Sequence, residues 1–290
     1  MGLAVMLELP LVVVDVQRAG PSTGLPTKTE QSDLMQALYG RNGEAPMVVM
    51  AASSPSDCFH YAFWAGKIAL ERMTPVILLT DGFIANGSEP WKIPSMKDYP
   101  GIDAPVVEKR DGDCYYCYDR DPETLARTWA IPGTPGLEHR IGGLEKDARR
   151  GSASHDPMNH QKMTDLRAEK VARVADCIPK QEVFGEPGGD LLVVGWGGTK
   201  GHLQSAVKKM QDEGRKVSLC HFNWINPLPT GCEEIFAKFE KIVVCELNMG
   251  QFANYLRMNF PKFTFGQYNK VQGLPFTVDE LKAHFESILK

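Results

Sequence analysis

Short apolar runs alternate with helical patterns in the first part of the chain, and this alternation constrains the fold most strongly. The apolar runs lie at Leu9–Val16, Met47–Ala51 and Val76–Thr80, and the helical patterns lie at Gln31–Tyr39 and Asp57–Arg72. A β-α-β-α-β order is typical of a parallel sheet with helices on both faces. The first run has almost no polar interruption, which predicts a strand covered on both faces. We therefore predict an α/β fold with a doubly wound, largely parallel sheet.

The rest of the chain divides into an irregular segment and a second, smaller α/β domain. Residues 96–187 are rich in proline, glycine and charge, and only Gln161–Ile178 has a helical pattern. From residue 188 onward, strands and helices alternate again; the expected elements are Asp190–Gly195, Lys200–Glu213, Lys216–Phe222, Cys232–Phe239, Lys241–Glu246, Gly250–Phe260 and Val278–Leu289. The predicted regions are therefore residues 1–95, 96–187 and 188–290.

Composition argues against several classes of protein. The net charge of -4 disfavours a nucleic-acid or anionic-membrane partner held by bulk electrostatics. No apolar run approaches the roughly 20 residues of a membrane-spanning helix. The apolar N-terminus contains Glu8 and lacks a basic leader, so we expect a strand there and a cytoplasmic protein.

Cys114 and Cys117 form the one close cysteine pair, which matches neither a zinc nor an iron–sulfur pattern, and His155 and His160 fit a solvated turn; no metal site is predicted.

A ligand site is indicated where the first apolar run ends. The segment Asp15–Thr27 (DVQRAGPSTGLPT) combines an arginine with glycines, prolines and hydroxyl residues. Ligands of open α/β sheets bind beyond the carboxyl ends of the strands, and glycine and proline allow tight turns there. The guanidinium of Arg18 could grip a carboxylate or phosphate with two parallel hydrogen bonds. The alternative is an ordinary turn with Arg18 in solvent, but the density of special residues favours a site.

Other residues are weaker candidates for lining the ligand cleft that is expected beyond these strand ends. Ser22 and Thr23 belong to this segment and Lys28 directly follows it, and all three could line the cleft. Asp81 follows the strand Val76–Thr80, where it could face the cleft, although an aspartate that forms the turn is at least as plausible.

A glycine-rich turn opens the last region. Residues Gly195–Gly198 precede a helix and could present backbone N–H groups to an anion. They lack the spacing of a dinucleotide site, so a tight structural turn is favoured.

Several stretches resemble α subunits of 2-oxoacid:acceptor oxidoreductases, and within them the 2-oxoglutarate:ferredoxin type. The matching stretches keep one order through the chain: Asp15–Leu34, Tyr39–Pro46, Ser54–Phe59, Thr74–Gly82, Ile131–Leu144 and Asn269–Phe276.

The resemblance implies a thiamine-diphosphate enzyme that decarboxylates 2-oxoglutarate oxidatively to succinyl-CoA. The acyl group goes to coenzyme A and the electrons go to ferredoxin. It implies that residues 1–95 form the C-terminal half of a pyrimidine-binding domain, and that residues 188–290 are similar to the transketolase C-terminal domain. A β subunit would hold the diphosphate, Mg²⁺ and an iron–sulfur cluster, and the heterodimer would self-associate.

The resemblance also assigns site residues. Arg18 would hold the substrate carboxylate and Thr27 would line the substrate site; for Thr27 the alternative is an N-terminal helix cap. The second carboxylate of 2-oxoglutarate needs another cation. Lys28 and Arg41 are near in sequence, but a solvated side chain is favoured for both, and the cation could come from the partner chain.

One departure from the family affects function. The Tyr-Pro-Ile-Thr-Pro-like segment and the cofactor-activating glutamate of the family are missing, so we expect a fragment, a truncated gene model or a split subunit that is inactive alone. Another chain would have to cover the sheet edge that is left exposed. The rival functions are a structural or assembly subunit and a free-standing anion-binding module. Pyruvate and branched-chain 2-oxoacids remain open as substrates.

Overall fold

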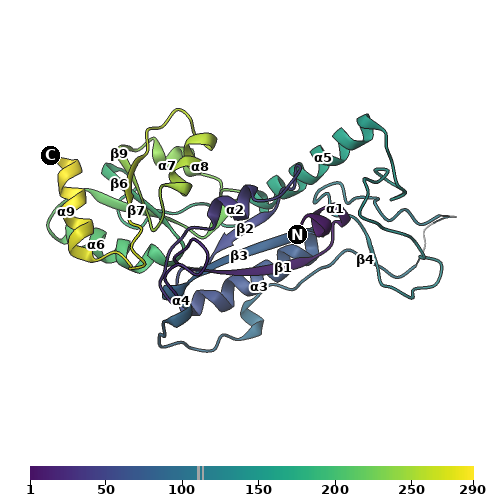
Figure 1. The fold of residues 1–290 in the computed structure, drawn as a ribbon, viewed down its shortest axis with the longest axis horizontal. Helices are drawn as coiled ribbons and strands as arrows, with labels where there is room; N and C mark the ends of the chain where they lie inside the picture. Colours follow the sequence, from purple (N-terminus) through teal and green to yellow (C-terminus); the bar gives the residue numbers. More distant parts are fainter. Residues whose placement is uncertain (110–111, 113) are drawn as a thin grey trace.

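The computed structural model describes residues 1–109, 112 and 114–290. The first of its two larger sheets contains β1 (Leu11–Gln17), β3 (Pro75–Asp81), β2 (Val48–Ala51) and β8 (Trp224–Asn226), in that order (Figure 1). The first three strands are parallel, whereas β8 is antiparallel to β2. The α/β prediction with a largely parallel sheet is confirmed. The strand β8 was not predicted, and it carries the later part of the chain into the first sheet.

Three helices accompany this sheet: α2 (Leu34–Tyr39), α3 (Pro55–Arg72) and α4 (Gly82–Asn86). The helix that the sequence predicted at residues 57–72 begins earlier, after the cap Ser54, whose side chain accepts a hydrogen bond from the N–H of Asp57. Proline is favoured at the first position of a helix because its nitrogen has no hydrogen to satisfy, which moves the start of α3 to residue 55.

The second sheet is entirely parallel, with the order β10 (Gly266–Asn269), β9 (Phe239–Glu246), β6 (Gly189–Trp196) and β7 (Val217–Phe222). Its helices are α6 (Lys200–Asp212), α7 (Cys232–Phe236), α8 (Gln251–Asn259) and α9 (Val278–Leu289), and the short turn η3 (Gly197–Thr199) precedes α6. The helix predicted at residues 232–239 is too long, because Phe239 already pairs in β9.

The two sheets share one hydrophobic core. Val49 and Leu79 of the first sheet belong to the same buried cluster as Val194 and Phe222 of the second and Phe252 of α8. Separate clusters lie under α3 on the first sheet and under α6 and α9 on the second. The regional boundaries at residues 95 and 187 stay a prediction.

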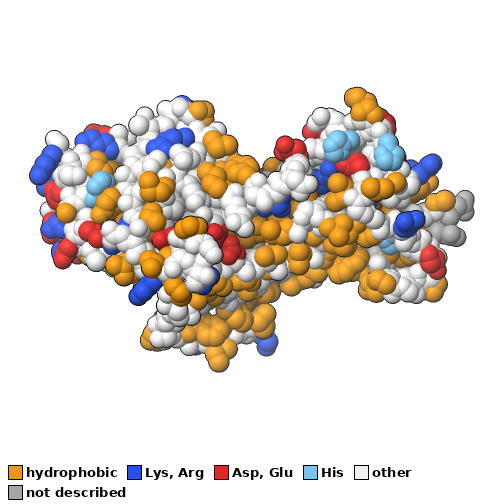
Figure 2. Space-filling view, viewed as in Figure 1, with side chains coloured by type: hydrophobic (Ala, Val, Ile, Leu, Met, Phe, Trp, Pro, Cys, Tyr) orange, Lys and Arg blue, Asp and Glu red, His pale blue; other side chains and the backbone are white. Residues whose placement is uncertain are grey.

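Strand β1 lies at an edge of the first sheet. Within the described part of the chain it pairs only with β3, and the side chains of Val14 and Val16 are 55% and 51% exposed. The prediction that this strand is covered on both faces is therefore wrong, because Val14 and Val16 point to the same face of the strand and both are exposed. Figure 2 shows a band of hydrophobic side chains over the part of the molecule where β1 lies in Figure 1.

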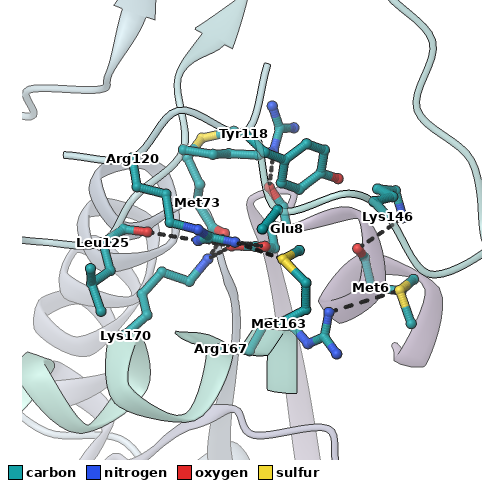
Figure 3. Close-up of polar contacts among 12 residues, drawn as sticks. Met6, Glu8, Met73, Tyr118, Arg120, Leu125, Lys146, Met163, Arg167 and Lys170 are labelled. Atoms are coloured by element: carbon teal, nitrogen blue, oxygen red, sulfur yellow. Dashed lines mark hydrogen bonds and ion pairs between the residues drawn. The ribbon is translucent and has the colours of Figure 1, made fainter. Parts of the chain in front are cut away.

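The N-terminal residues form a helix, α1 (Gly2–Leu7), where the sequence predicted a strand. Glu8 ends this helix in a left-handed conformation with φ of 52°. Its side chain is 1% exposed and forms ion pairs with Arg120 and Lys170 (Figure 3). These partners fix the position of Glu8. Because they lie more than 100 residues away in the sequence, no local sequence pattern predicts them.

The ion pairs of Glu8 also fasten residues 96–187 to the segment that leads into β1. This segment contains η1 (Met96–Asp98), β4 (Val106–Val107), β5 (Trp129–Ala130), α5 (Pro157–Ala172) and η2 (Arg173–Cys177). The helix predicted at residues 161–178 thus begins earlier, at a Pro preceded by an Asp cap, and its last turn is a 3-10 helix.

Basic side chains of this segment converge on the end of α1. The Nζ of Lys170 also donates to the carbonyl of Met73 at 2.9 Å, and the Nε of Arg127 donates to the carbonyl of Glu8 at 3.0 Å. The hydroxyl of Tyr118 donates to the carbonyl of Leu7 at 3.0 Å. We define the side chains of Glu8, Tyr118, Arg120, Arg127 and Lys170 as the Glu8 cluster.

In the described part of the chain, no helix has the length and apolar character needed to span a bilayer.

Candidate functional site

The carboxyl ends of three parallel strands form the edge where the sequence predicted a site. Gln17 at the end of β1 lies beside Asp81 at the end of β3, and Ala51 at the end of β2 lies beside Leu79. The segment after β1 therefore begins at the ligand-binding edge of an open α/β sheet. We call residues 18–28 the Arg18 loop.

The Arg18 loop has a fixed backbone although most of its side chains are exposed. The N–H of Ala19 donates to the carbonyl of Lys28 at 2.9 Å, and the N–H of Leu25 donates to the carbonyl of Ala19 at 3.1 Å. Gly24 has φ of 50°, and a Cβ atom there would lie 2.1 Å from the carbonyl oxygen of Ala19. Only glycine fits this position, because both the conformation and the close contact exclude a side chain.

Arg18 is exposed at the start of the loop. Its one side-chain hydrogen bond within the described residues is a long contact of 3.5 Å from Nη2 to the carbonyl of Ser22, and it has no ion pair there. The guanidinium fork is therefore open toward solvent, which fits an anion partner. Its binding of a substrate carboxylate stays a prediction.

Thr27 is exposed and has φ of 63°. The cap alternative for Thr27 is wrong, because α2 begins seven residues later, with Asp33 at the cap position. Ser22, Thr23 and Lys28 are also exposed on this loop, and their role in a cleft stays a prediction.

The Arg18 loop packs against the C-terminal part of the chain. Gly273 has φ of 65°, and a Cβ atom there would lie 2.8 Å from the Cβ of Lys28 and 3.1 Å from the Cδ1 of Leu25. Both contacting segments belong to stretches that carry the family resemblance. No local sequence pattern predicts this contact, because the two stretches lie near opposite ends of the chain.

Asp81 forms the turn after β3. Its side chain is 2% exposed, and Oδ1 accepts hydrogen bonds from the N–H of Phe83 at 2.8 Å and from the Oγ1 of Thr29 at 3.0 Å. Burial raises the pKa of Asp81, although these hydrogen bonds oppose that effect. The turn-forming alternative is thus observed, and a contact of Asp81 with the cleft stays a prediction.

The glycine turn that precedes α6 meets the same carboxylate. The backbone N–H of Gly198 hydrogen bonds to Asp81, and a Cβ atom at Gly198 would lie 2.1 Å from the Oδ2 of Asp81. The turn therefore presents an N–H to an anion, but the anion belongs to this chain. A tight structural turn, as the sequence favoured, is confirmed by its close contact with β3.

Gln31 joins the site edge to the second sheet, and the sequence did not single it out. Its Nε2 donates to the carbonyl of Trp196 at 2.7 Å, and its Oε1 accepts from the N–H of Leu247 at 3.0 Å. The side chain is fully buried. A buried amide with both ends satisfied fixes the segment that follows the Arg18 loop.

The sequence favoured a solvated side chain for Arg41, and the structure shows that this prediction is wrong. Its guanidinium donates to the carbonyls of Ala37 at 2.9 Å, Leu38 at 2.8 Å and Ala45 at 3.0 Å. Burial lowers its pKa. Because Arg41 satisfies free carbonyls at the end of α2, it is occupied with a structural role.

A second anion contact at the site edge was also missed. Glu89 Oε1 accepts from the Oγ of Ser54 at 2.8 Å and from the N–H of Ser56 at 2.5 Å, at the start of α3. Hydrogen bonds from Ser56 and Ser54 lower the pKa of Glu89. The Ser and Pro residues at 53–56 signal a helix start, but no sequence pattern predicts which carboxylate meets it.

Known proteins are similar to this chain over most of its length. The family described as pyruvate flavodoxin/ferredoxin oxidoreductase, thiamine-diphosphate-binding, matches residues 1–158. The 2-oxoglutarate oxidoreductase subunit KorA of Mycobacterium tuberculosis (strain ATCC 25618 / H37Rv) is 49% identical over 283 residues, which cover 97% of this chain and 42% of that protein. The 2-oxoglutarate synthase subunit KorA of Methanothermobacter marburgensis is 29% identical, over 86% of this chain and 66% of that protein.

A solved structure has the same fold. The 2-oxoglutarate:ferredoxin oxidoreductase from Magnetococcus marinus, with 2-oxoglutarate, coenzyme A and succinyl-CoA bound, matches with a TM-score of 0.93 and 32% identity. The match covers 100% of this chain and 50% of that one. The chain thus spans about half the length of several proteins that it matches.

Proposed function

Because this chain belongs to the pyruvate flavodoxin/ferredoxin oxidoreductase family through its thiamine-diphosphate-binding part, we propose that it works as part of a 2-oxoacid:ferredoxin oxidoreductase. The proposed reaction is the oxidative decarboxylation of 2-oxoglutarate to succinyl-CoA, with ferredoxin as the electron acceptor. The similarity to KorA proteins and to the Magnetococcus marinus enzyme supports this choice of substrate. The observation that carries the role of this chain is the exposed Arg18 just after the carboxyl end of β1, which forms no ion pair with any residue that the structure describes.

The donors of the Arg18 loop fit a carboxylate. A guanidinium offers two parallel N–H groups in a rigid fork, and the exposed hydroxyls of Thr23 and Thr27 add further donors. Thiamine diphosphate, when bound, supplies the electron sink for the loss of carbon dioxide. Arg18 would orient the carboxylate that leaves, and Thr27 would help to position the substrate. Fixing that orientation before the bond breaks lowers the barrier.

We assign the remaining cofactor functions to a β subunit. The described residues contain no group of three or more His, Cys, Asp and Glu side chains arranged around a metal position. The β subunit would hold Mg²⁺, the diphosphate and the iron–sulfur cluster. The free edge of β1, with Val14 and Val16 exposed beside it, supports a covering partner on this side of the chain.

The role of Arg18 can be tested in the reconstituted complex. Arg18→Ala should reduce kcat/KM for 2-oxoglutarate by roughly 30- to 900-fold, which corresponds to about 2–4 kcal/mol for a lost charge-assisted contact. Arg18→Lys should recover part of this loss, because a lysine keeps the charge but not the fork. Arg150→Ala is the matched control, since Arg150 is exposed and its side chain forms no hydrogen bond in the described part of the chain. Unchanged kinetics in Arg18→Ala would reject the substrate-binding role and favour a structural subunit.

A further inference from the structure

A cavity of about 550 Å³ lies between residues 179–184 and the edge of the second sheet. The backbone of its outer wall is fixed to β7 by two hydrogen bonds between Phe184 and Leu219, at 2.8 and 3.0 Å. A further hydrogen bond of 3.0 Å joins the N–H of Gln181 to the carbonyl of Thr230. The wall therefore belongs to the folded sheet, and the cavity has the size of a small-molecule site.

Three hydrogen-bond donors with no partner line this cavity. Lys200 and Gln204 are four residues apart on α6, so they lie on the same face of that helix. Lys180 comes from the opposite, outer wall. None of the three side chains forms a hydrogen bond or ion pair with any residue that the structure describes.

The charge of the lining is positive. The lining contains two lysines, Lys180 and Lys200, and a single carboxylate, that of Glu182, which is exposed. His221 also lines the cavity, but burial lowers its pKa to about 3, with the charge of Lys200 acting in the same direction. His221 is therefore neutral near pH 7 and adds no charge. Two unpaired ammonium groups around one cavity attract an anion.

The remaining lining selects among anions. Three aromatic side chains also line the cavity: Phe184, which is 37% exposed, and Tyr61 and Trp224, whose ring centroids lie 6.0 Å apart. Lysines bind phosphate groups as mobile point charges, and an aromatic wall accommodates a ring or an acyl group. We propose that this cavity binds a small phosphate ester, with the phosphate between Lys180, Lys200 and Gln204 and its organic part against the aromatic wall. None of the lining residues belongs to the Arg18 loop, so this site is additional to the proposed substrate contact.

The test is calorimetric titration of the full 290-residue chain with pyrophosphate, and separately with citrate. Pyrophosphate should bind to one saturable site. The double variant Lys180→Gln/Lys200→Gln should weaken that binding at least about tenfold, because two charge-assisted contacts are lost. The double variant Lys92→Gln/Lys97→Gln is the matched control, since it removes the same charge from two exposed lysines outside the cavity, and it should leave the affinity unchanged.

A neutral variant separates contact from general charge. Gln204→Leu keeps the net charge and should still weaken pyrophosphate binding, by about threefold or more. Thermal melts without ligand should match the wild-type chain for all variants, because the changed side chains have no partners to lose. Equal weakening in both double variants, tighter binding of citrate than of pyrophosphate, or the lack of saturable binding by the wild-type chain would overturn the proposal.

Discussion

Replacing Glu8 with glutamine should cost about 3–5 kcal/mol of folding stability, because it leaves buried cations without their anion. Arg120 Nη1 donates to Glu8 at 2.7 Å, and Lys170 forms a second ion pair with it. Burial by itself would raise the pKa of Glu8, but the charges of Lys170 and Arg120 outweigh burial and lower it to about 2. The difference from the ordinary value of 4.5 corresponds to about 3 kcal/mol, which agrees with the first figure.

The assay is urea and thermal unfolding of the wild-type chain and Glu8→Gln near pH 7. A loss of this size should lower Tm by roughly 6–20 °C. Asp212→Asn is the control, because Asp212 pairs with Lys208 on the surface of α6, where such pairs contribute about 0.3–0.5 kcal/mol.

The dependence on pH gives a second readout. The folded pKa of Glu8 lies below its unfolded value, so its contribution is complete above about pH 4.5 and is lost as the pH falls toward 2. The stability difference between wild type and Glu8→Gln should shrink over that interval. A Glu8→Gln variant no less stable than Asp212→Asn would refute the reasoning.

Three further substitutions test the surroundings of the site. Gly24→Ala should lower the kcat/KM of the reconstituted complex at least about tenfold, because its Cβ would collide with the carbonyl of Ala19; Gly43→Ala, which has a positive φ but open space, should not. Gln31→Leu should destabilise the chain by about 1–3 kcal/mol in urea unfolding, since it leaves the buried N–H of Leu247 unpaired, whereas the carbonyl of Trp196 keeps its bond from Thr199; a loss below about 0.5 kcal/mol would contradict this. Arg41→Gln should lower the free energy of unfolding by about 1 kcal/mol in the same assay, because hydrogen bonds to backbone carbonyls are lost. An unaltered stability would mean that Arg41 has no structural role.

The parallel strands and the long helices could be predicted because their signals are local. The helix Val278–Leu289 was predicted with its observed bounds, and it begins with a capping box formed by Thr277 and Glu280. Strands β2 and β3 are continuous apolar runs bounded by breakers, and both are fully buried. Periodicity and caps act within a few residues, so the sequence displays them directly.

The missed elements depend on distant contacts. β8 is three residues long and exists as a strand through its pairing with β2. The helix α1 replaces a predicted strand because Glu8 is held by residues more than 100 positions away. Apolar runs of this length do not distinguish helix from strand without such information.

The candidate site divides in the same way. The sequence indicated the exposed Arg18 loop, because a charged residue among glycines and prolines at a strand end is a local pattern. It missed Gln31 and the contact of Gly273 with the loop, since both join segments that are far apart in the chain. It assigned Arg41 to solvent, because nothing local shows that three backbone carbonyls surround the guanidinium.

Purification of the native complex through this chain tests the central claim most directly. We expect a thiamine-binding, cluster-bearing chain to co-purify, and the complex to reduce ferredoxin when both 2-oxoglutarate and coenzyme A are supplied. Mass spectrometry identifies the partner, and the assay without coenzyme A is the control. Recovery of this chain without such a partner and without activity toward any 2-oxoacid would contradict the proposed function.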